Sequence, residues 1–96
     1  MANRVFQGVI FQMKEAIDRM LGVVDETGTV ISCTELNAIG ETREGFAAER
    51  LVAGDIFTKD GFTYRQFSST KHNDYAVFVE GVDEAAFQFA AMLAIS

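Results

Sequence analysis

The sequence predicts an α+β domain, in which helices flank an antiparallel sheet. Three observations support this prediction. A stretch with helical periodicity opens the chain, an apolar helix-like run closes it, and short glycine-separated runs rich in β-branched and aromatic residues lie between them. The order of these runs favours antiparallel pairing with the helices on one face of the sheet. We expect the N- and C-terminal helices to pack together or in a dimer.

The first helix is predicted over residues 5–21. When successive residues are placed about 100° apart, nine apolar residues lie on one broad arc and the charged residues lie opposite them. Phe11 is the exception, because it falls within the polar face. Two interpretations of Phe11 stay open: an ordinary exposed side chain, or a contact with a partner.

A hairpin is predicted next, with strands over residues 22–25 and 29–33. Gly28 in the loop can adopt a positive φ, which suits a short hairpin connection. Residues 34–38 are predicted to be irregular or briefly helical.

The clearest strands are predicted over residues 62–67 and 75–81. A turn over residues 58–61 precedes the first, and a polar loop, residues 68–74, joins the two. The second strand is apolar almost throughout, which is typical of a central strand covered on both faces.

Asp83 is predicted to cap a last helix that runs to Ser96. This helix is apolar nearly all round and ends without a glycine, a proline or a basic last turn. We therefore expect it to be buried against a second copy, and we expect the natural chain to continue beyond it. The residues predicted to contact a second copy are Phe6, Phe11, Phe89 and Met92.

Length and composition indicate one domain over residues 1–96. The net charge of −6 disfavours contact with nucleic acid by this domain itself. Its single cysteine, Cys33, excludes an internal disulfide and fits a reducing cytoplasm. No apolar run approaches the roughly 20 residues that span a bilayer. A soluble cytoplasmic domain without a membrane contact is expected.

The sequence offers little for catalysis. Cys33 and His72 are the only residues that could form a cysteine–histidine pair, and a lone cysteine at a strand end is more often a small apolar residue. The remaining carboxylates have no metal-ligand spacing. We predict a protein that is not an enzyme and uses no cofactor or metal.

A binding site is predicted near the second helix. Thr42 can cap a helix over residues 43–52, Gly40 lets backbone approach closely, and Arg43 adds a positive charge at the helix start. Such a helix start attracts carboxylate or phosphate groups. The neighbouring glutamates could satisfy the same donors, so both outcomes stay open.

Polar residues of the strand 62–67 extend this site. Tyr64 and Gln66 share one face, and Thr63 and Arg65 share the other. One pair points toward a helical layer or a small cavity in it, where a polar ligand could satisfy it. The alternative, that Arg65 simply lies on an exposed face of the sheet, stays open. The candidate ligand-binding residues are Ser32, Thr34, Gly40, Arg43, Tyr64 and Arg65.

Residues 18–47 resemble a known family, the N-terminal sugar-diacid recognition domain of bacterial carbohydrate-diacid and purine-catabolism transcription regulators. The matching residues are Asp18-Arg19, the run Val24-Asp25-Glu26-Thr27-Gly28, Ile39-Gly40 and Glu44-Gly45. The chain departs from the family at three positions: it has Leu36 where proline is common, Ala38 in place of arginine and Arg43 in place of histidine.

The resemblance implies a PAS-like or GAF-like sensor that is cytoplasmic and homodimeric and precedes a helix-turn-helix domain, which would make the DNA contacts. The expected function is therefore the sensing of a small carboxylate or diacid in a bacterial transcription regulator. The alternative is a dimerisation module of the same kind of regulator that binds no ligand.

Overall fold

The computed structural model describes residues 2–54, 56–67 and 75–95, with side chains from Gln7 to Ala94 within these ranges. The elements in chain order are α1 (Ala2–Lys14), β1 (Leu21–Val24), β2 (Val30–Cys33), the 3₁₀ turn η1 (Leu36–Ala38), α2 (Phe46–Ala53), β3 (Ile56–Lys59), β4 (Phe62–Gln66), β5 (Ala76–Glu80) and α3 (Glu84–Ile95).

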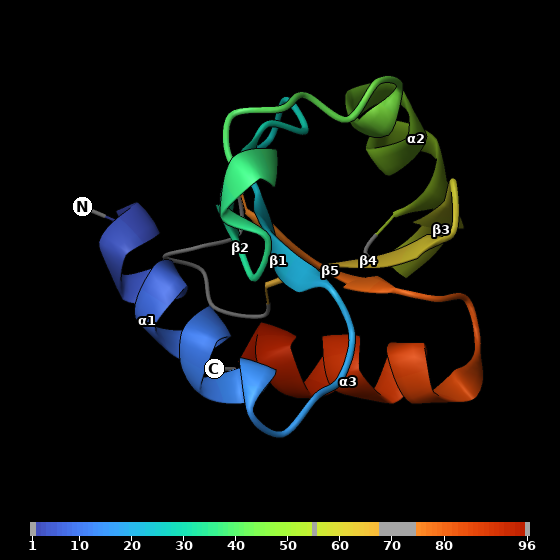
Figure 1. Cartoon of the computed structure of the whole chain (residues 1–96). Coiled ribbons are helices and arrows are strands. Elements are labelled where there is room, and N and C mark those ends of the chain that lie inside the picture. Colours follow the sequence, from blue (N-terminus) through green and yellow to red (C-terminus); the bar gives the residue numbers. More distant parts are fainter. Residues whose placement is uncertain (1, 55, 68–74, 96) are drawn as a thin grey trace.

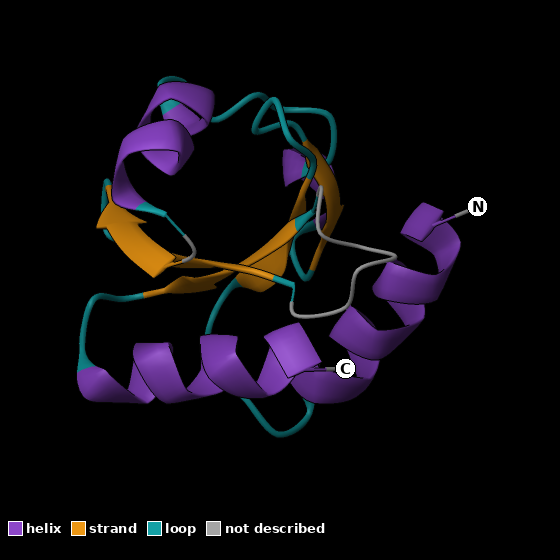
Figure 2. Ribbon diagram, turned by 180° about the vertical axis from the view of Figure 1, so that it is seen from behind, coloured by secondary structure: helices purple, strands orange, loops and turns teal. Residues whose placement is uncertain are grey.

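The five strands form one antiparallel sheet in the order β2-β1-β5-β4-β3. Helices α1 and α3 lie on one face, and α2 and η1 lie on the other (Figure 1); Figure 2 shows the same layers from behind. The predicted α+β class and antiparallel sheet are confirmed. The prediction that helices cover one face only is wrong, because the central strand β5 is apolar on both faces. Val77 and Val79 face α3, while Ala76 and Phe78 face α2.

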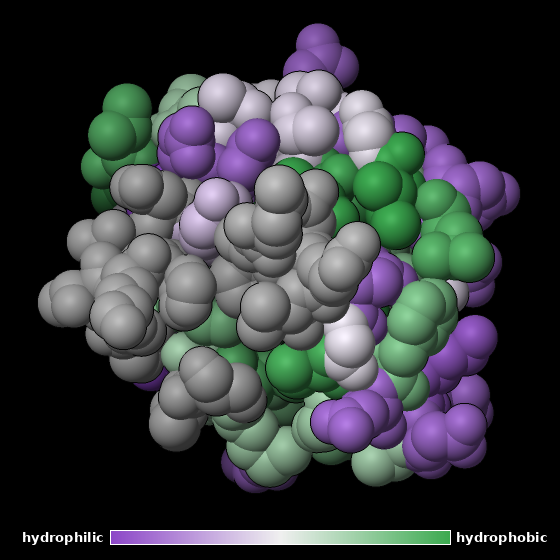
Figure 3. All heavy atoms as spheres, turned by 90° about the vertical axis from the view of Figure 1, so that its left-hand side faces the viewer, coloured by the Kyte–Doolittle hydropathy of each residue, from purple (hydrophilic) through white to green (hydrophobic). Residues whose placement is uncertain are grey.

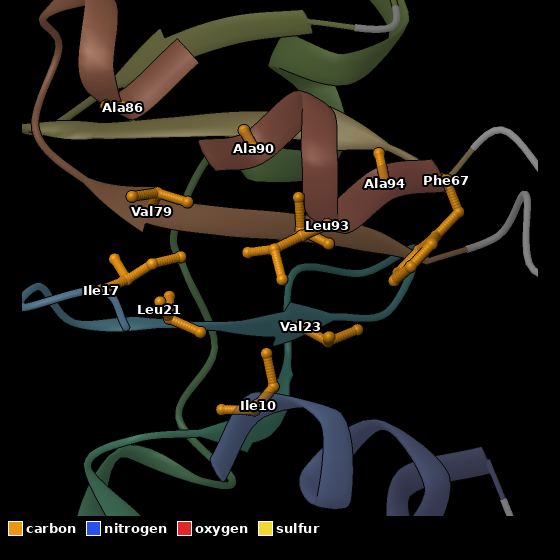
Figure 4. Close-up of a cluster of buried hydrophobic side chains, with 11 residues drawn as sticks. Ile10, Ile17, Leu21, Val23, Phe67, Val79, Ala86, Ala90, Leu93 and Ala94 are labelled. Atoms are coloured by element: carbon orange, nitrogen blue, oxygen red, sulfur yellow. The ribbon is translucent and has the colours of Figure 1, made fainter. Parts of the chain in front are cut away.

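The terminal helices share one core within the chain. Ile10 of α1 and Leu93 of α3 belong to the same buried cluster, which also contains Val23 of β1 (Figure 4). The cluster comprises Ile10, Ile17, Leu21, Val23, Phe67, Val77, Val79, Ala86, Ala90, Leu93 and Ala94. α1 ends at Lys14 rather than at residue 21, because Ile17 enters this core and Leu21 already begins β1.

The predicted cap of α3 is confirmed. Asp83 Oδ1 accepts a hydrogen bond from the N–H of Ala86 at 3.1 Å. The same carboxylate accepts two hydrogen bonds from Arg19, at 2.7 and 2.8 Å, and Arg19 also donates to the carbonyl of Glu80. The Arg19 guanidinium holds the pKa of Asp83 well below its usual range. One arginine thus attaches the segment after α1 to the start of α3.

The second helix begins three residues later than predicted, and Thr42 does not cap it. Thr42 pairs instead with Thr29, through a backbone bridge and a 3.2 Å contact between their hydroxyl oxygens. The N–H of Arg43 donates to the carbonyl of Gly28, so it does not point outward. Gly45, with a φ of 80°, precedes α2 without a side-chain cap. Among the described residues, no helix is long and apolar enough to cross a bilayer.

The predicted hairpin is confirmed, with its turn held by Asp25. Asp25 Oδ1 accepts hydrogen bonds from the N–H groups of Thr27 and Thr29, at 2.9 and 3.0 Å, and from the Thr27 hydroxyl at 2.7 Å. Gly28 supplies the expected positive φ of 88°. By contrast, β3 is a strand that was not predicted.

Asp25 makes stability depend on pH. Partial burial acts to raise the pKa of Asp25, but the hydrogen bonds from Thr27 and Thr29 outweigh it and hold the pKa below the ordinary value. A carboxyl with a lowered folded-state pKa contributes stability above its unfolded-state pKa, about 3.9, and loses it as pH falls through the folded-state pKa. Urea unfolding of Asp25→Asn should therefore show a stability deficit at pH 7 that shrinks below about pH 4.

The matched control is Glu26→Gln, which removes one charge from an exposed side chain of the same turn. It should change stability little at any pH. A deficit for Asp25→Asn that stays constant down to pH 2 would contradict the role given to the Asp25 carboxylate.

Candidate ligand-binding site

One row of residues crosses all five strands in register. Each of its residues lies directly opposite the next on the neighbouring strand. Three of them, Tyr64, Phe78 and Cys33, belong to the buried cluster on the α2 side of the sheet. The row, called here the cross-strand row, consists of Phe57, Tyr64, Phe78, Gly22 and Cys33. It forms a floor on this side of the sheet, and α2 packs over the β3–β4 end of that floor.

Aromatic rings dominate the β3–β4 end of this floor. Phe57 and Tyr64 stack, with ring centroids 5.2 Å apart and planes 18° from parallel. Phe46, the buried residue of α2, lies 5.6 Å from Phe57 and 5.1 Å from Tyr64. This packing attaches α2 to the sheet.

Gly22 makes room for the ring of Phe78. A Cβ on Gly22 would lie 2.7 Å from Cζ of Phe78 and would also collide with the backbone oxygen of Ser32. The ring therefore lies over a position that only glycine can fill. It reaches toward Phe62, with ring centroids 5.7 Å apart in an edge-on arrangement.

Arg43 places a guanidinium on these two rings. Its Cζ is 4.6 Å from the ring centroid of Phe62 and 4.9 Å from that of Phe78, within cation–π range. Its Nε is buried and has no hydrogen-bond partner among the described residues. Buried N–H groups normally have an acceptor. Within the described part of the chain, Arg43 forms no ion pair, and both neighbouring glutamates, Glu41 and Glu44, are exposed.

The charge of Arg43 acts on two other members of the site. Burial raises the pKa of Tyr64, and Arg43 opposes that rise. Burial likewise raises the pKa of the Cys33 thiol, where Arg43 again acts in the lowering direction. Cys33 is fully buried, so it is not an accessible nucleophile.

Lys59 adds a second cation on the same side of the sheet. It pairs with Phe62 across the β3–β4 hairpin, and Phe62 is the ring that Arg43 covers. A Cβ on Gly45 would lie 3.0 Å from Lys59 Cε and 3.3 Å from Nζ, so the ammonium group lies against the start of α2. Its contact with Asp60 is long, 3.8 Å. Two cations, Arg43 and Lys59, thus lie on the same side of the sheet in a chain of net charge −6.

Two of the six predicted ligand-binding residues come together. Arg43 and Tyr64 both lie on the α2 side of the sheet. Ser32 and Arg65 lie on the other side, since they pair with Val23 and Val77 of the α1–α3 core.

The other two predicted residues lie at the margins. Gly40 is exposed in the loop that follows η1, and its N–H donates to the carbonyl of Val30 at 2.8 Å. Thr34 is buried, and its hydroxyl accepts a hydrogen bond from the N–H of Leu21 at 3.3 Å. Neither residue contributes to the aromatic floor.

Sequence reasoning did not find Gly22, Lys59, Phe62 and Phe78 as members of the site. Phe62 alternates with Tyr64 along β4, so the period of two indicates a shared face. The contributions of β1, β3 and β5 depend on the strand order, which one sequence does not provide.

A depression of the described surface lies beside the segment after α1, away from Arg43. It has a volume of about 290 Å³ and is lined by Lys14, Ile17, Asp18, Arg19, Met20, Thr34, Glu35 and Glu80. Its charges are mixed, and Arg19 is already paired with Asp83. The Arg43 site is therefore the stronger candidate for an anionic ligand.

Comparisons of the chain with protein-family models, with curated proteins and with solved structures find no match. The function is therefore inferred from the residues of the site.

Proposed function

We propose that this chain is a small-molecule sensor domain, which binds a small carboxylate or dicarboxylate between the sheet and α2. The observation that carries the proposal is the Arg43 guanidinium, which rests on Phe62 and Phe78 and whose buried Nε has no acceptor among the described residues.

The chemistry of this arrangement suits a carboxylate. A guanidinium presents paired N–H groups that match the two oxygens of a carboxylate. The aromatic rings hold its plane, and their low polarity strengthens the charge-assisted hydrogen bonds. The aromatic floor also offers apolar surface to the carbon skeleton of a ligand.

Lys59 favours a ligand with two acidic groups. Arg43 and Lys59 both adjoin Phe62; Arg43 forms no ion pair among the described residues, and Lys59 has a long ion pair with Asp60, at 3.8 Å. A dicarboxylate could bind Arg43 with one end and Lys59 with the other. The resemblance to sugar-diacid recognition domains supports the same ligand class and a role in a PAS-like part of a bacterial transcription regulator.

Sensing requires that the ligand prefer one of two conformations. α2 is a suitable moving element, because Phe46 is its buried residue and most of its other side chains are exposed. A ligand held by Arg43, just before α2, and by Lys59, against its start, would favour the packed position of the helix.

A thermal-shift panel tests the proposal. Dicarboxylates, sugar acids, purine breakdown products and buffer anions are compared at equal ionic strength. A ligand at 100 times its Kd should stabilise the fold by about 2.7 kcal/mol. Arg43→Met should abolish the shift, and Lys59→Met should weaken it for dicarboxylates more than for monocarboxylates.

Arg65→Met is the matched control, because Arg65 also has a buried Nε without a described partner but lies on the other face of the sheet. It should leave the shift unchanged. No response to any anion, or a response that survives Arg43→Met, would refute the site.

A ligand-free dimerisation module is the second candidate function. Exposed apolar side chains on the terminal helices favour it: Phe11 of α1 is 39% exposed, and Met92 of α3 is 50% exposed. Phe89 is partly buried against the core, and the side chain of Phe6 lies outside the described residues. On the face in Figure 3, apolar areas alternate with hydrophilic ones. A silent ligand panel with a stable dimer would favour this function.

A further inference from the structure

The two edges of the sheet differ in how their outward backbone groups are satisfied. On β2, Val30 donates to the carbonyl of Glu41 and accepts from the N–H of Gly40, both at 2.8 Å. The Gln7 side chain of α1 binds both backbone groups of Cys33, at 3.0 and 3.1 Å. The β2 edge is thus closed by this chain.

The β3 edge presents two residues outward. The N–H of Phe67 donates to the carbonyl of Tyr75, and the N–H of Gly81 donates to the carbonyl of Gly61. These two bonds flank β4, so the backbone groups of its odd-numbered residues are hydrogen-bonded to β5. Because bonding direction alternates along a strand, the even-numbered residues of β4 bond to β3 at Phe57 and Lys59.

The backbone groups of Ile56 and Thr58 therefore point away from the sheet. Both residues are exposed, Ile56 by 40%, and no hydrogen bond to their outward groups is found among the described residues. Unpaired N–H and C=O groups on an edge are a template for another strand.

The helix beside this edge is apolar on its outer side. α2 lies over β3 in Figure 1 and packs on it through Phe46 and Phe57. Opposite Phe46, the helix presents Leu51 and Val52, which are 88% and 86% exposed. Large aliphatic side chains exposed to this degree beside an open strand mark an interaction surface.

We propose that β3 and the outer side of α2 form the interface with a second copy of this chain, through antiparallel β3–β3 pairing centred on Phe57. This register sets Ile56 of each copy opposite Thr58 of the other, so that their outward groups exchange four backbone hydrogen bonds. The two sheets then form one continuous sheet, and the two α2 helices lie beside the junction. Leu51 and Val52 become less exposed to solvent there.

A second copy is the occupant that the strand itself favours. Antiparallel pairing of one strand with itself is isologous, which closes a dimer and leaves no open edge to extend further. The Lys59 side chains lie at opposite ends of the junction, so like charges do not face each other. The net charge of −6 per chain opposes association, and salt should therefore strengthen it.

Sedimentation equilibrium of the chain at several salt concentrations tests the proposal, which does not depend on any ligand. Thr58→Pro removes the outward N–H at a position where an edge strand tolerates proline. Thr58→Val keeps that N–H and is its matched control. Leu51→Lys alters a side chain that is 88% exposed in the single chain, so its folding is not at risk.

The expected result is a dimer for the wild type and for Thr58→Val, and at least about tenfold weaker association for Thr58→Pro and Leu51→Lys. Far-UV circular dichroism should show all four chains folded. A wild type that stays monomeric at every concentration overturns the proposal. A dimer that survives Leu51→Lys but dissociates on Phe11→Lys also overturns it, and places the interface on α1.

Discussion

Replacing Phe46 by alanine should lower the free energy of unfolding by about 3–5 kcal/mol, the usual cost of truncating a buried phenylalanine. Phe46 is 1% exposed and packs against Phe57 and Tyr64. Since a small domain has about 5–15 kcal/mol of total stability, this loss is a large part of it. Urea unfolding followed by circular dichroism measures the effect.

The matched control for Phe46→Ala is Leu51→Ala, on the same helix but 88% exposed. In dilute, monomeric protein it should change stability by less than about 0.5 kcal/mol. Equal effects of the two substitutions would mean that α2 is not packed through Phe46. The Arg43 site, which depends on α2, would then lose its support.

Replacing Gly22 by alanine should cost about 3 kcal/mol, the upper end of ordinary overpacking in a core. The new methyl group would lie 2.7 Å from Cζ of Phe78 and would collide with backbone of the neighbouring strand. The backbone of β2 at Ser32 cannot move away cheaply, because β2 is paired with β1 on one side and hydrogen-bonded to Gln7 and the loop after η1 on the other. The ring of Phe78 must shift as well, and Arg43 rests on that ring.

Gly8→Ala is the control, and it is expected to change stability in the opposite direction. Gly8 is exposed in α1, and a Cβ there meets nothing within 4 Å. Alanine in a helix interior is favoured over glycine by roughly 0.5–1 kcal/mol, so the variant should be more stable than the wild type. If Gly22→Ala were equally harmless, the close packing of β1 under Phe78 would be incorrect.

The parts of the fold that local chemistry determines were predictable. The hairpin turn depends on Asp25 and Gly28, which are three residues apart, and the cap of α3 depends on Asp83 alone. The strands β4 and β5 were also found, because each is a run of aromatic and β-branched residues between turn signals.

The parts that tertiary contacts determine were not predictable. Thr42 has the right side chain for a helix cap, but a contact with Thr29, 13 residues earlier, takes its hydroxyl. β3 has only four residues and weak alternation, and its pairing with β4 defines it. In the same way, the sequence indicates Arg43 and Tyr64 as two separate candidates. They belong to one site only because the strand order places β4 next to β5, whose Phe78 lies beside both.

The central claim is that Arg43 receives the carboxylate of a ligand. The most direct measurement is the ¹H–¹⁵N resonance of Arg43 Nε during titration with a series of dicarboxylates, assigned by its loss in Arg43→Lys. The proposed function predicts a saturable shift of this resonance and slower exchange of its proton, while the Nε resonance of Arg65 stays in place. An Arg43 signal that no member of the series moves, or an equal shift of both arginines, would contradict it.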